Sequence, residues 1–433
     1  MTSDLPAESA VTSTPLDRPR HSEAVIHRRR TRCRACDGTG LRAFLSLGPQ
    51  PLANAFLSGE DDVDDERFFP LDVYCCDACG LVQLLDVVDP EALFGNYIYA
   101  SGVSETMAAH FRDYARSVTK TLSLSPADLV VEIASNDGSL LARFAALGVR
   151  TLGVEPARNI AALARARGIE TVSRFFDHQV GREIATAYGP ARAVVANNVL
   201  AHVDDPRSFL AGCAELIGDD GQIVVEVPYA RDMLDRCEYD TIYHEHLCYF
   251  TVDPLARIGA SAGLSLARVE RMPVHGGTIR VWFRKGAEHG PQVRSMMQEE
   301  RDARLMAFAT WAQFGRAVAA NREAIRSLLQ GLQEEGRSIA GYGAPAKGNK
   351  LLNYCGIGTT WLPFTVDRSS LKVGRLTPGM HIPVLPVEAL RERQPDYLLL
   401  LAWNFADEIM AQLTGYRQAG GRFILPLPVP GII

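Results

Sequence analysis

The chain has 433 residues, and its 45 Lys and Arg against 51 Asp and Glu give a formal net charge of -6. That balance argues against a nucleic-acid-binding protein, which usually carries a basic face. Hydrophobic residues make up 47% of the chain and charged residues 22%, which is ordinary globular usage. No apolar run approaches the roughly 20 residues needed to span a bilayer, and the N-terminus lacks the pattern of a signal peptide. We therefore expect a cytoplasmic protein of roughly three domains, without membrane or nucleic-acid partners.

The pattern along the chain predicts four stretches. Residues 1–30 are rich in Ser, Thr, Pro and Arg and predict a disordered, solvated tail. Residues 31–95 hold five of the nine cysteines and predict a small metal-binding module. In residues 96–290 strands alternate with helices, which indicates a Rossmann-like domain with a parallel sheet. Residues 291–433 begin with one or two long helices and continue as a second Rossmann-like unit, so the predicted fold class is α/β.

Two C-x-x-C pairs lie in the N-terminal module, Cys33 with Cys36 and Cys76 with Cys79. Four thiolates close a structural Zn²⁺ site and leave no coordination position open for catalysis. Cys75 could replace Cys76, but only Cys76 keeps the two-residue spacing. The alternatives are reduced core cysteines or a redox pair, and neither pair sits at the strand–helix turn of a thioredoxin-like unit. The pattern therefore favours structural zinc.

Small and polar residues follow three predicted strands of the central domain, where ligands bind in open α/β sheets. The pattern resembles that of S-adenosylmethionine-dependent methyltransferases, with a small-residue loop, an acid suited to a ribose diol and a polar strand end. An alanine stands where a glycine is expected, and the alternative is a polar turn without a ligand. The predicted cofactor residues are Glu132, Ala134, Asn136, Asp137, Gly138, Glu155, Pro156, Asn198 and His202.

A run of titratable side chains, Tyr243-His244-Glu245-His246, follows the strand that ends near Glu226. On a helix the two histidines would point about 200° apart, so they could not chelate one metal ion. On an extended segment they would share a face, with the tyrosine and the glutamate on the other. We expect acid–base chemistry, in which a neighbouring carboxylate raises the basicity of a histidine. The alternative is a structural, hydrogen-bonded histidine cluster.

A second strand–loop–helix unit carries Gly341, Gly343 and Ala346, which match G-x-G-x-x-A. Asp367 ends the next strand, where a dinucleotide fold places its ribose acid, so this unit alone suggests NAD. A lysine at a helix N-terminus is also a general anion site, and a nucleotide diphosphate would satisfy it equally well. The predicted substrate contacts are Tyr342, Lys347 and Asn349, together with His275 in a tight turn at the mouth of the cleft.

The motifs taken together resemble one family. CRACDG, CDACGLVQL, VEIASNDGSLL, GVEP, IYHEHLCYF, HGGTIR and GYGAPAKGNK occur in this order across residues 33–433. They resemble the three-domain sugar C-methyltransferases of antibiotic deoxysugar biosynthesis. The resemblance implies methyl transfer from S-adenosylmethionine to C-3′ of a dTDP-linked 4-keto-deoxysugar, often a 3-amino sugar, through an enolate. It assigns the last domain to the substrate nucleotide.

Carried over by position, the resemblance implies that His246 is the general base, with Glu245 and Tyr243 beside it. Tyr97, or the competing Tyr99, would reach the sugar from the N-terminal side. We expect a monomer without an obligate protein partner. The rival interpretations are an NAD(P)-dependent oxidoreductase of a nucleotide sugar, an O- or N-methyltransferase of the same sugar, and a non-catalytic zinc-bearing scaffold.

Overall fold

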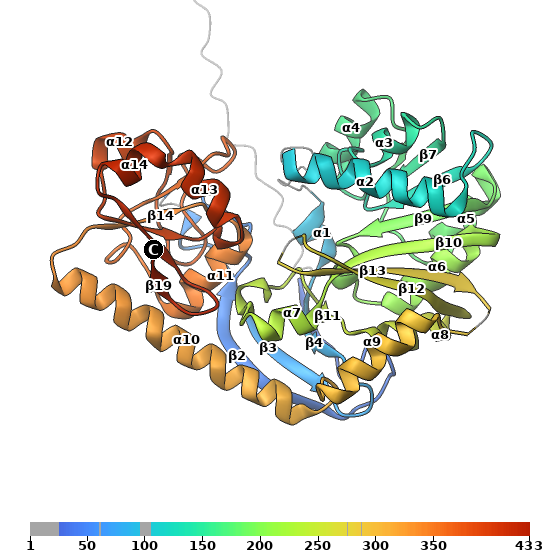
Figure 1. Cartoon of the computed structure of the whole chain (residues 1–433), viewed down its shortest axis with the longest axis horizontal. Helices are drawn as coiled ribbons and strands as arrows, with labels where there is room; N and C mark the ends of the chain where they lie inside the picture. Colours follow the sequence, from blue (N-terminus) through green and yellow to red (C-terminus); the bar gives the residue numbers. More distant parts are fainter. Residues whose placement is uncertain (1–25, 60–61, 96–104, 275, 287) are drawn as a thin grey trace, which may run out of the picture.

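The computed structural model describes residues 26–59, 62–95, 105–274, 276–286 and 288–433 (Figure 1). Tyr97, Tyr99, His275 and the first 25 residues lie outside this described part. The described residues form a two-stranded sheet and three larger sheets, flanked by helices, and the predicted α/β fold class is confirmed. Within the described residues, no helix is both long and apolar enough to cross a membrane.

The N-terminal sheet is antiparallel, with strand order β11-β4-β3-β2. The edge strand β11 comes from the middle of the chain, so residues 31–95 do not complete this sheet alone. The described strands and the short helix here are β1 His27–Arg29, β2 Leu41–Pro51, β3 Phe68–Cys76, β4 Val82–Leu84, β5 Asp86–Val88, α1 Pro90–Phe94 and β11 Cys248–Tyr249.

Residues 27–29 differ from the expected tail, because they form β1 and pair with β5. Charge pairing accounts for the order. The Asp204 carboxylate accepts hydrogen bonds from Arg28, Arg30 and the buried Arg34. Asp86 pairs with Arg29 at 2.7 Å. The basic run is therefore paired with acidic side chains of the folded chain, although Arg28 and Arg29 stay about half exposed.

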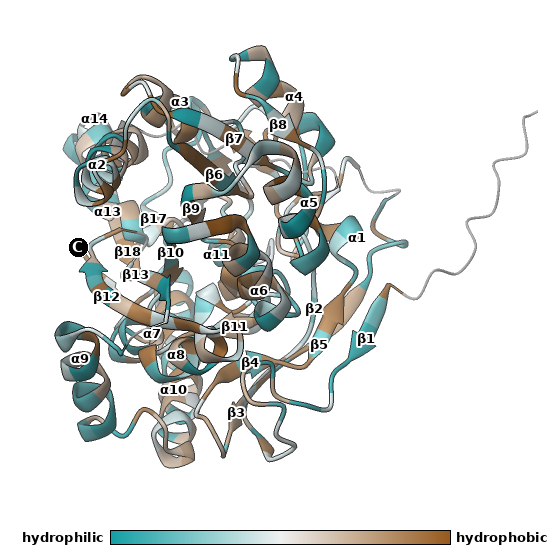
Figure 2. Cartoon of the chain, turned by 90° about the vertical axis from the view of Figure 1, so that its right-hand side faces the viewer, coloured by the Kyte–Doolittle hydropathy of each residue, from teal (hydrophilic) through white to brown (hydrophobic). Residues whose placement is uncertain are grey.

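The central sheet has the order β12-β13-β10-β9-β6-β7-β8 and is parallel except at β13. All five residues of β6 are buried, as in a parallel strand covered on both faces. Its strands are β6 Leu129–Ile133, β7 Arg150–Val154, β8 Thr171–Val172, β9 Ala191–Asn197, β10 Ile217–Pro228, β12 Leu264–Met272 and β13 Thr278–Lys285. Its helices are α2 Glu105–Leu122, α3 Leu141–Ala145, α4 Arg158–Ala166, α5 His178–Tyr188, α6 Pro206–Leu216, α7 Ala230–Asp235 and α8 Val252–Ser261. The strands at its centre are the most apolar part of this region (Figure 2).

The C-terminal sheet has the order β16-β15-β14-β17-β18-β19 and is parallel except for β19. Two helices, α9 Pro291–Asp302 and α10 Phe308–Glu334, lead into it, and α10 packs against β2 of the N-terminal sheet (Figure 1). The remaining elements are β14 Ile339–Tyr342, α11 Ala346–Cys355, β15 Thr365–Asp367, β16 Val384–Pro386, α12 Ala389–Arg393, β17 Tyr397–Leu400, α13 Ala406–Gln412, α14 Thr414–Gln418, β18 Arg422–Leu425 and β19 Gly431–Ile432. Gly356, in the left-handed region at φ 65°, ends α11, the helix that contacts β2 of the N-terminal sheet and the turn at Tyr239–Thr241.

Candidate active site

A cavity of about 910 Å³ opens where the three parts of the chain meet. The N-terminal part contributes Asn54 and Phe94 to its lining, and the C-terminal part contributes Lys347 and Phe405. The central part contributes the loops after β6, β7 and β9 and the turn that holds His246. A volume of this size lies within the range of small-molecule and cofactor sites.

The predicted cofactor residues, with one exception, line this cavity. The loop after β6 turns sharply, because Ala134 and Asn136 have φ of 55° and 50°. A glycine is expected at residue 134 for this reason, since only glycine adopts such angles without a steric cost. Gly138 does not line the cavity. A Cβ there would lie 3.0 Å from Ile169 Cγ1, so Gly138 serves the packing of the loop.

Two acidic side chains shape the cofactor end of the cavity. Glu155 Oε2 accepts a hydrogen bond from the Asn136 backbone N–H at 2.9 Å, and Oε1 accepts one from the Ala157 backbone N–H at 2.8 Å. Each oxygen keeps a second lone pair for a ligand hydroxyl. Burial raises the pKa of Glu132, and the nearby Glu155 and Asp137 raise it further. Glu132 Oε2 is buried and has no hydrogen-bond partner among the described residues. An unpaired buried acceptor is costly, so these loops fit a ligand that brings hydrogen-bond donors, as the adenosine and amino groups of S-adenosylmethionine do.

The run from Tyr243 to His246 forms a turn, which is neither the helix nor the extended segment considered from the sequence, because the His246 backbone amide donates to the Tyr243 carbonyl at 2.8 Å. The Tyr243 and His246 rings therefore lie against each other, with centroids 4.0 Å apart. His244 points the other way, and its Nε2 lies 3.2 Å from the carbonyls of Phe69 and Pro70. The structural interpretation thus suits His244, whereas Tyr243, Glu245 and His246 line the cavity.

The His246 ring is held in one orientation. Its Nδ1 lies 2.8 Å from the Thr241 carbonyl, which can only accept, so Nδ1 carries the proton and Nε2 the lone pair. The His202 ring meets it edge-on at 4.7 Å. Burial lowers the pKa of His246 well below its ordinary value, and the nearby His202 and Lys347 add to this effect. Among the described residues no carboxylate raises the pKa of His246, contrary to expectation, and its lowered pKa favours the neutral imidazole, whose Nε2 lone pair is available.

The predicted substrate contacts separate into two groups. Lys347 lines the cavity, and its Nζ lies 3.5 Å from Glu238 Oε2. Burial raises the pKa of Glu238 to about 7, although Lys347 opposes the shift. Tyr342 and Asn349 do not line the cavity. Asn349 is fully buried, and its Nδ2 donates to the Ala53 carbonyl at 2.8 Å, so it faces the N-terminal part instead of a ligand.

The loop at the second glycine motif also differs from a dinucleotide site. Asp367 Oδ2 accepts from the Ala344 amide at 2.8 Å, and Oδ1 accepts from the Ser369 amide at 2.8 Å. Lys372 Nζ lies 3.6 Å from the same carboxylate. Asp367 does not line the cavity. It holds the loop in place and does not act as the ribose-binding acid of a dinucleotide site.

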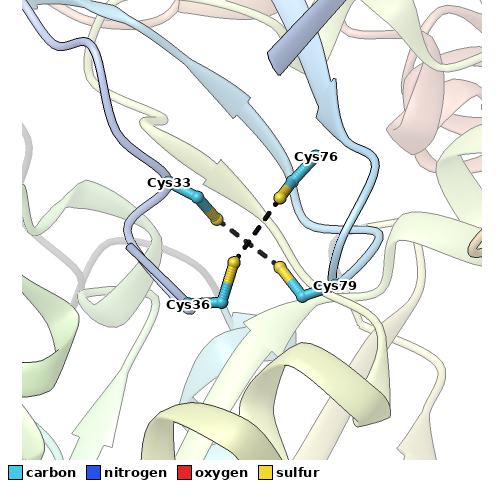
Figure 3. A group of neighbouring side chains, drawn as sticks. All are labelled: Cys33, Cys36, Cys76 and Cys79. Atoms are coloured by element: carbon cyan, nitrogen blue, oxygen red, sulfur yellow. Dashed lines mark hydrogen bonds between the residues drawn. The ribbon is translucent and has the colours of Figure 1, made fainter. Parts of the chain in front are cut away.

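The four predicted metal ligands meet at one point (Figure 3). The Cys33 and Cys79 sulfurs lie 3.5 Å apart, and those of Cys36 and Cys76 lie 3.6 Å apart. Tetrahedral Zn–S bonds of about 2.3 Å require sulfurs roughly 3.8 Å apart, so the donor set fits a structural zinc ion. Cys75 is buried outside the cluster, with its thiol 3.9 Å from the Cys76 carbonyl.

Sequence reasoning missed three features of the site. The Asn54 amide donates to Glu245 Oε1 at 2.7 Å, across 191 residues of chain. The Thr241 carbonyl that orients His246 leaves no trace in a motif. Glu226, at the end of β10, accepts from His110 Nε2 at 2.9 Å and from Arg280, which ties α2 to the sheet beside the cavity. Each depends on contacts between distant residues, and only the polar strand end at Glu226 offered a signal.

Comparison with known proteins matches the chain to three family models. They are a zinc binding domain over residues 33–94, a methyltransferase domain over residues 107–269 and a C-methyltransferase C-terminal domain over residues 273–428. The chain is 40% identical over 404 residues to the C-methyltransferase NovU of Streptomyces niveus, covering 93% of this chain and 96% of that protein.

Solved structures are more distant. The magnesium protoporphyrin IX methyltransferase of Synechocystis PCC 6803, with bound S-adenosylmethionine, is 15% identical, with a TM-score of 0.32, over 42% of this chain and 82% of that chain. The CcbJ methyltransferase of Streptomyces caelestis is 16% identical, with a TM-score of 0.32, over 41% of this chain and 90% of that chain.

The relationship to NovU and the three matched models decide between the rival interpretations. They confirm the family indicated by the sequence motifs, together with S-adenosylmethionine and zinc as its cofactors. An oxidoreductase, an O- or N-methyltransferase and a non-catalytic scaffold do not agree with this relationship. The chain belongs to the S-adenosylmethionine-dependent C-methyltransferases that carry an N-terminal zinc-binding domain.

Proposed function

We propose that the protein methylates C-3′ of a dTDP-linked 4-keto-deoxysugar, with or without a 3-amino group, in antibiotic deoxysugar biosynthesis. The observation that carries the proposal is the shared cavity. It brings the cofactor loops of the central sheet, the oriented His246 and the cationic Lys347 to one space. Two large ligands held at their distant nucleotide ends would be oriented toward each other there, and such orientation lowers the entropic part of the barrier.

In this proposal His246 Nε2 removes the C-3′ proton of the sugar. The ketone at C-4′ makes that proton acidic, because the negative charge spreads onto oxygen. Tyr243 lies against the imidazole, and we assign it a hydrogen bond to the enolate oxygen. By the family resemblance, Tyr97 or Tyr99 is the further tyrosine that contacts the sugar. S-adenosylmethionine, when bound, supplies the electrophilic methyl group that the sugar carbon accepts. Lys347 would pair with a phosphate of the nucleotide.

The same proposal covers the organisation of the chain. We place the zinc-binding module at residues 31–95, the methyltransferase domain at residues 96–290 and the nucleotide-binding domain at residues 291–433. We also propose that the protein acts as a monomer, and the residues that line the cavity come from the N-terminal, central and C-terminal parts of one chain. None of the nine cysteines forms a disulfide, which suits the cytoplasmic location that we propose.

The test uses the purified protein with S-adenosylmethionine and a dTDP-4-keto-deoxysugar. We expect a product heavier by one methylene unit with the new methyl on carbon. In D₂O without S-adenosylmethionine we expect deuterium to enter at C-3′. Methyl transfer to oxygen or nitrogen, without exchange at C-3′, would overturn the proposal.

The variant His246→Ala should lose both exchange and turnover by roughly 10²- to 10⁴-fold, the usual contribution of one positioned base. His244→Gln is the matched control, because His244 lies in the same turn but faces away from the cavity. It should keep wild-type turnover. Equal losses in the two variants would mean that the turn, and not the His246 base, is what turnover requires.

The pH profile of the wild-type enzyme gives a second check. Burial lowers the pKa of His246, so the free imidazole needs a pH below the ordinary histidine value of about 6.5 before it becomes protonated. We therefore expect kcat to stay level as the pH falls from about 8 to about 6.5, and to drop only below that range. A drop centred near or above 6.5 would contradict this assignment.

A further inference from the structure

The segment at residues 51–54, which begins at the last residue of β2, is held by the C-terminal helix α11. The Lys350 ammonium donates to the Pro51 carbonyl, and Asn349 Nδ2 donates to the Ala53 carbonyl at 2.8 Å. Both side chains are almost completely buried, with exposed fractions of 1% and 0%. Asn349 and Lys350, two and three residues after Lys347 in the glycine motif, therefore fix a backbone segment of another part of the chain.

The next residue of this segment reaches the catalytic turn. Asn54 is half-buried and lines the cavity, and its Nδ2 donates to Glu245 Oε1 at 2.7 Å. Glu245 lines the same cavity directly before His246. A continuous set of contacts thus runs from α11 through the 51–54 backbone to the carboxylate beside the base.

The chemistry of these contacts suits an oriented carboxylate. A neutral amide donates a hydrogen bond without introducing a second negative charge, and a hydrogen bond to a charged group is stronger than one between neutral groups. Burial lowers the pKa of the nearby Lys350, whereas Glu245 and Glu66 oppose that shift by favouring its positive charge. Asn54 therefore limits the directions that the Glu245 carboxylate can take while leaving it in the cavity wall.

We propose that Asn54 is a positioning residue that aims Glu245 at the sugar, and that Asn349 and Lys350 on α11 hold Asn54 in place. This inference rests on the proposed function, because it assigns Glu245 a contact with the same substrate. It also gives the glycine motif of the C-terminal part a second role, since the motif supplies Lys347 to the cavity and anchors the residue that sets its opposite wall.

The first experiment compares Asn54→Ala and Asn54→Asp with Gln50→Ala in the full-length enzyme. Gln50 is a buried amide in the same part of the chain, and its Nε2 donates only to the Leu47 carbonyl among the contacts of the described residues. We expect Asn54→Ala to lower kcat by about 10- to 100-fold, the scale of a misplaced reactive group, while the Kd of S-adenosylmethionine stays unchanged. Gln50→Ala should keep the wild-type kcat. An unchanged kcat in Asn54→Ala overturns the proposal.

The aspartate variant adds a readout that a merely structural residue would not change. At low pH the introduced carboxyl is protonated and can donate to Glu245, whereas at high pH two carboxylates repel each other. The ratio of its kcat to the wild-type kcat should therefore fall as the pH rises, while the same ratio for Asn54→Ala stays constant. A pH-independent ratio for the aspartate variant overturns the proposed hydrogen bond.

The second experiment tests the part played by α11 with Asn349→Ala and Asn353→Ala. Asn353 lies on the same helix, and its Nδ2 donates to the Asn349 backbone carbonyl at 2.7 Å and to the Pro378 carbonyl at 2.9 Å, not to the 51–54 segment. Of the two variants, we expect only Asn349→Ala to lower kcat, by about 10-fold, and we expect the two variants to have equal thermal stability. Equal kcat values for the two variants overturn the anchoring role.

Crystal structures of the wild-type enzyme and Asn54→Ala separate this inference from the proposed function. The Glu245 carboxylate should change its orientation in the variant while His246 keeps its contact with Thr241. An unmoved Glu245 overturns the inference. If the wild-type enzyme transfers no methyl group to a keto sugar, the proposed function fails, and the position of Glu245 still decides whether Asn54 orients it.

Discussion

The chain contains two strand–loop–helix units that look alike in sequence, and the structure uses them differently. After β6, the loop exposes most of its polar residues to the cavity, and the buried Glu132 keeps an oxygen without a partner among the described residues. In the second unit, Asp367 at the end of β15 accepts hydrogen bonds from the backbone amides of Ala344, in the loop after β14, and of Ser369. Of the polar residues in that helix's first turns, Lys347 reaches the cavity, whereas Asn349 and Lys350 bond another part of the chain.

The difference shows what a glycine-rich motif determines. It fixes a tight turn from a strand into a helix, because certain backbone angles and close approaches exclude larger side chains. It does not fix which part of the protein the first helical turns face. That depends on the neighbouring elements, and here the N-terminal part occupies the side of α11 where Asn349 and Lys350 point.

The largest difference between the two units is expected when the acid at the end of each unit's second strand is replaced. Glu155→Ala should raise the Kd of S-adenosylmethionine roughly 100-fold, because the cofactor loses its hydrogen bonds to the Glu155 carboxylate. The variant also loses the acceptors of the Asn136 and Ala157 backbone N–H groups. Asp367→Ala should leave this Kd within about twofold of wild type. Calorimetric titration measures both. Equal losses would mean that the two loops serve the cofactor together.

Two lysines three residues apart in the second unit should separate ligand binding from stability. Lys347→Met should raise the KM of the nucleotide sugar about 10-fold and leave the Kd of S-adenosylmethionine unchanged, because its cation lies in the cavity wall. Lys350→Met should leave that KM unchanged and should change the pH dependence of unfolding. Steady-state kinetics and urea unfolding measure these effects, and a KM effect at Lys350 alone would reverse the assignment.

The sign of the Lys350 effect follows from its burial, which lowers its pKa to about 7. An unfolded lysine titrates near 10.4, so between about pH 7 and pH 10 the unfolded chain binds more protons than the folded chain. The stability of wild type relative to Lys350→Met should therefore rise with pH in this window, by at most about 1.4 kcal/mol per pH unit. Below about pH 7 the difference should be constant, and a decrease above it would contradict the burial of this ammonium.

Local patterns predicted the fold class, the cysteine cluster and the loops of the central sheet, because C-x-x-C spacing and strand-end residues act over short stretches of chain. They did not predict that His244 and His246 diverge, since that depends on a turn closed by the Tyr243 carbonyl. They also missed Asn54, whose partner Glu245 is 191 residues away. Contacts across sheets carry no local periodicity, so an isolated sequence cannot reveal them.

The smallest expected effect comes from reciprocal substitutions at one backbone position in each unit. Ala134 has φ 55°, so Ala134→Gly removes a strained conformation and should raise the free energy of unfolding by roughly 0.5–1 kcal/mol. Gly343 has φ 87°, and a Cβ there would lie 3.1 Å from Ala402 Cβ, so Gly343→Ala should lower it by roughly 1–2 kcal/mol. Urea unfolding of the two variants should therefore give changes of opposite sign. Because Ala134 lines the cofactor end of the cavity and Gly343 does not, only the first substitution should alter the Kd of S-adenosylmethionine. The same sign in both variants would mean that Ala134→Gly relieves no backbone strain. The alanine at residue 134 would then be explained by its contact with the ligand.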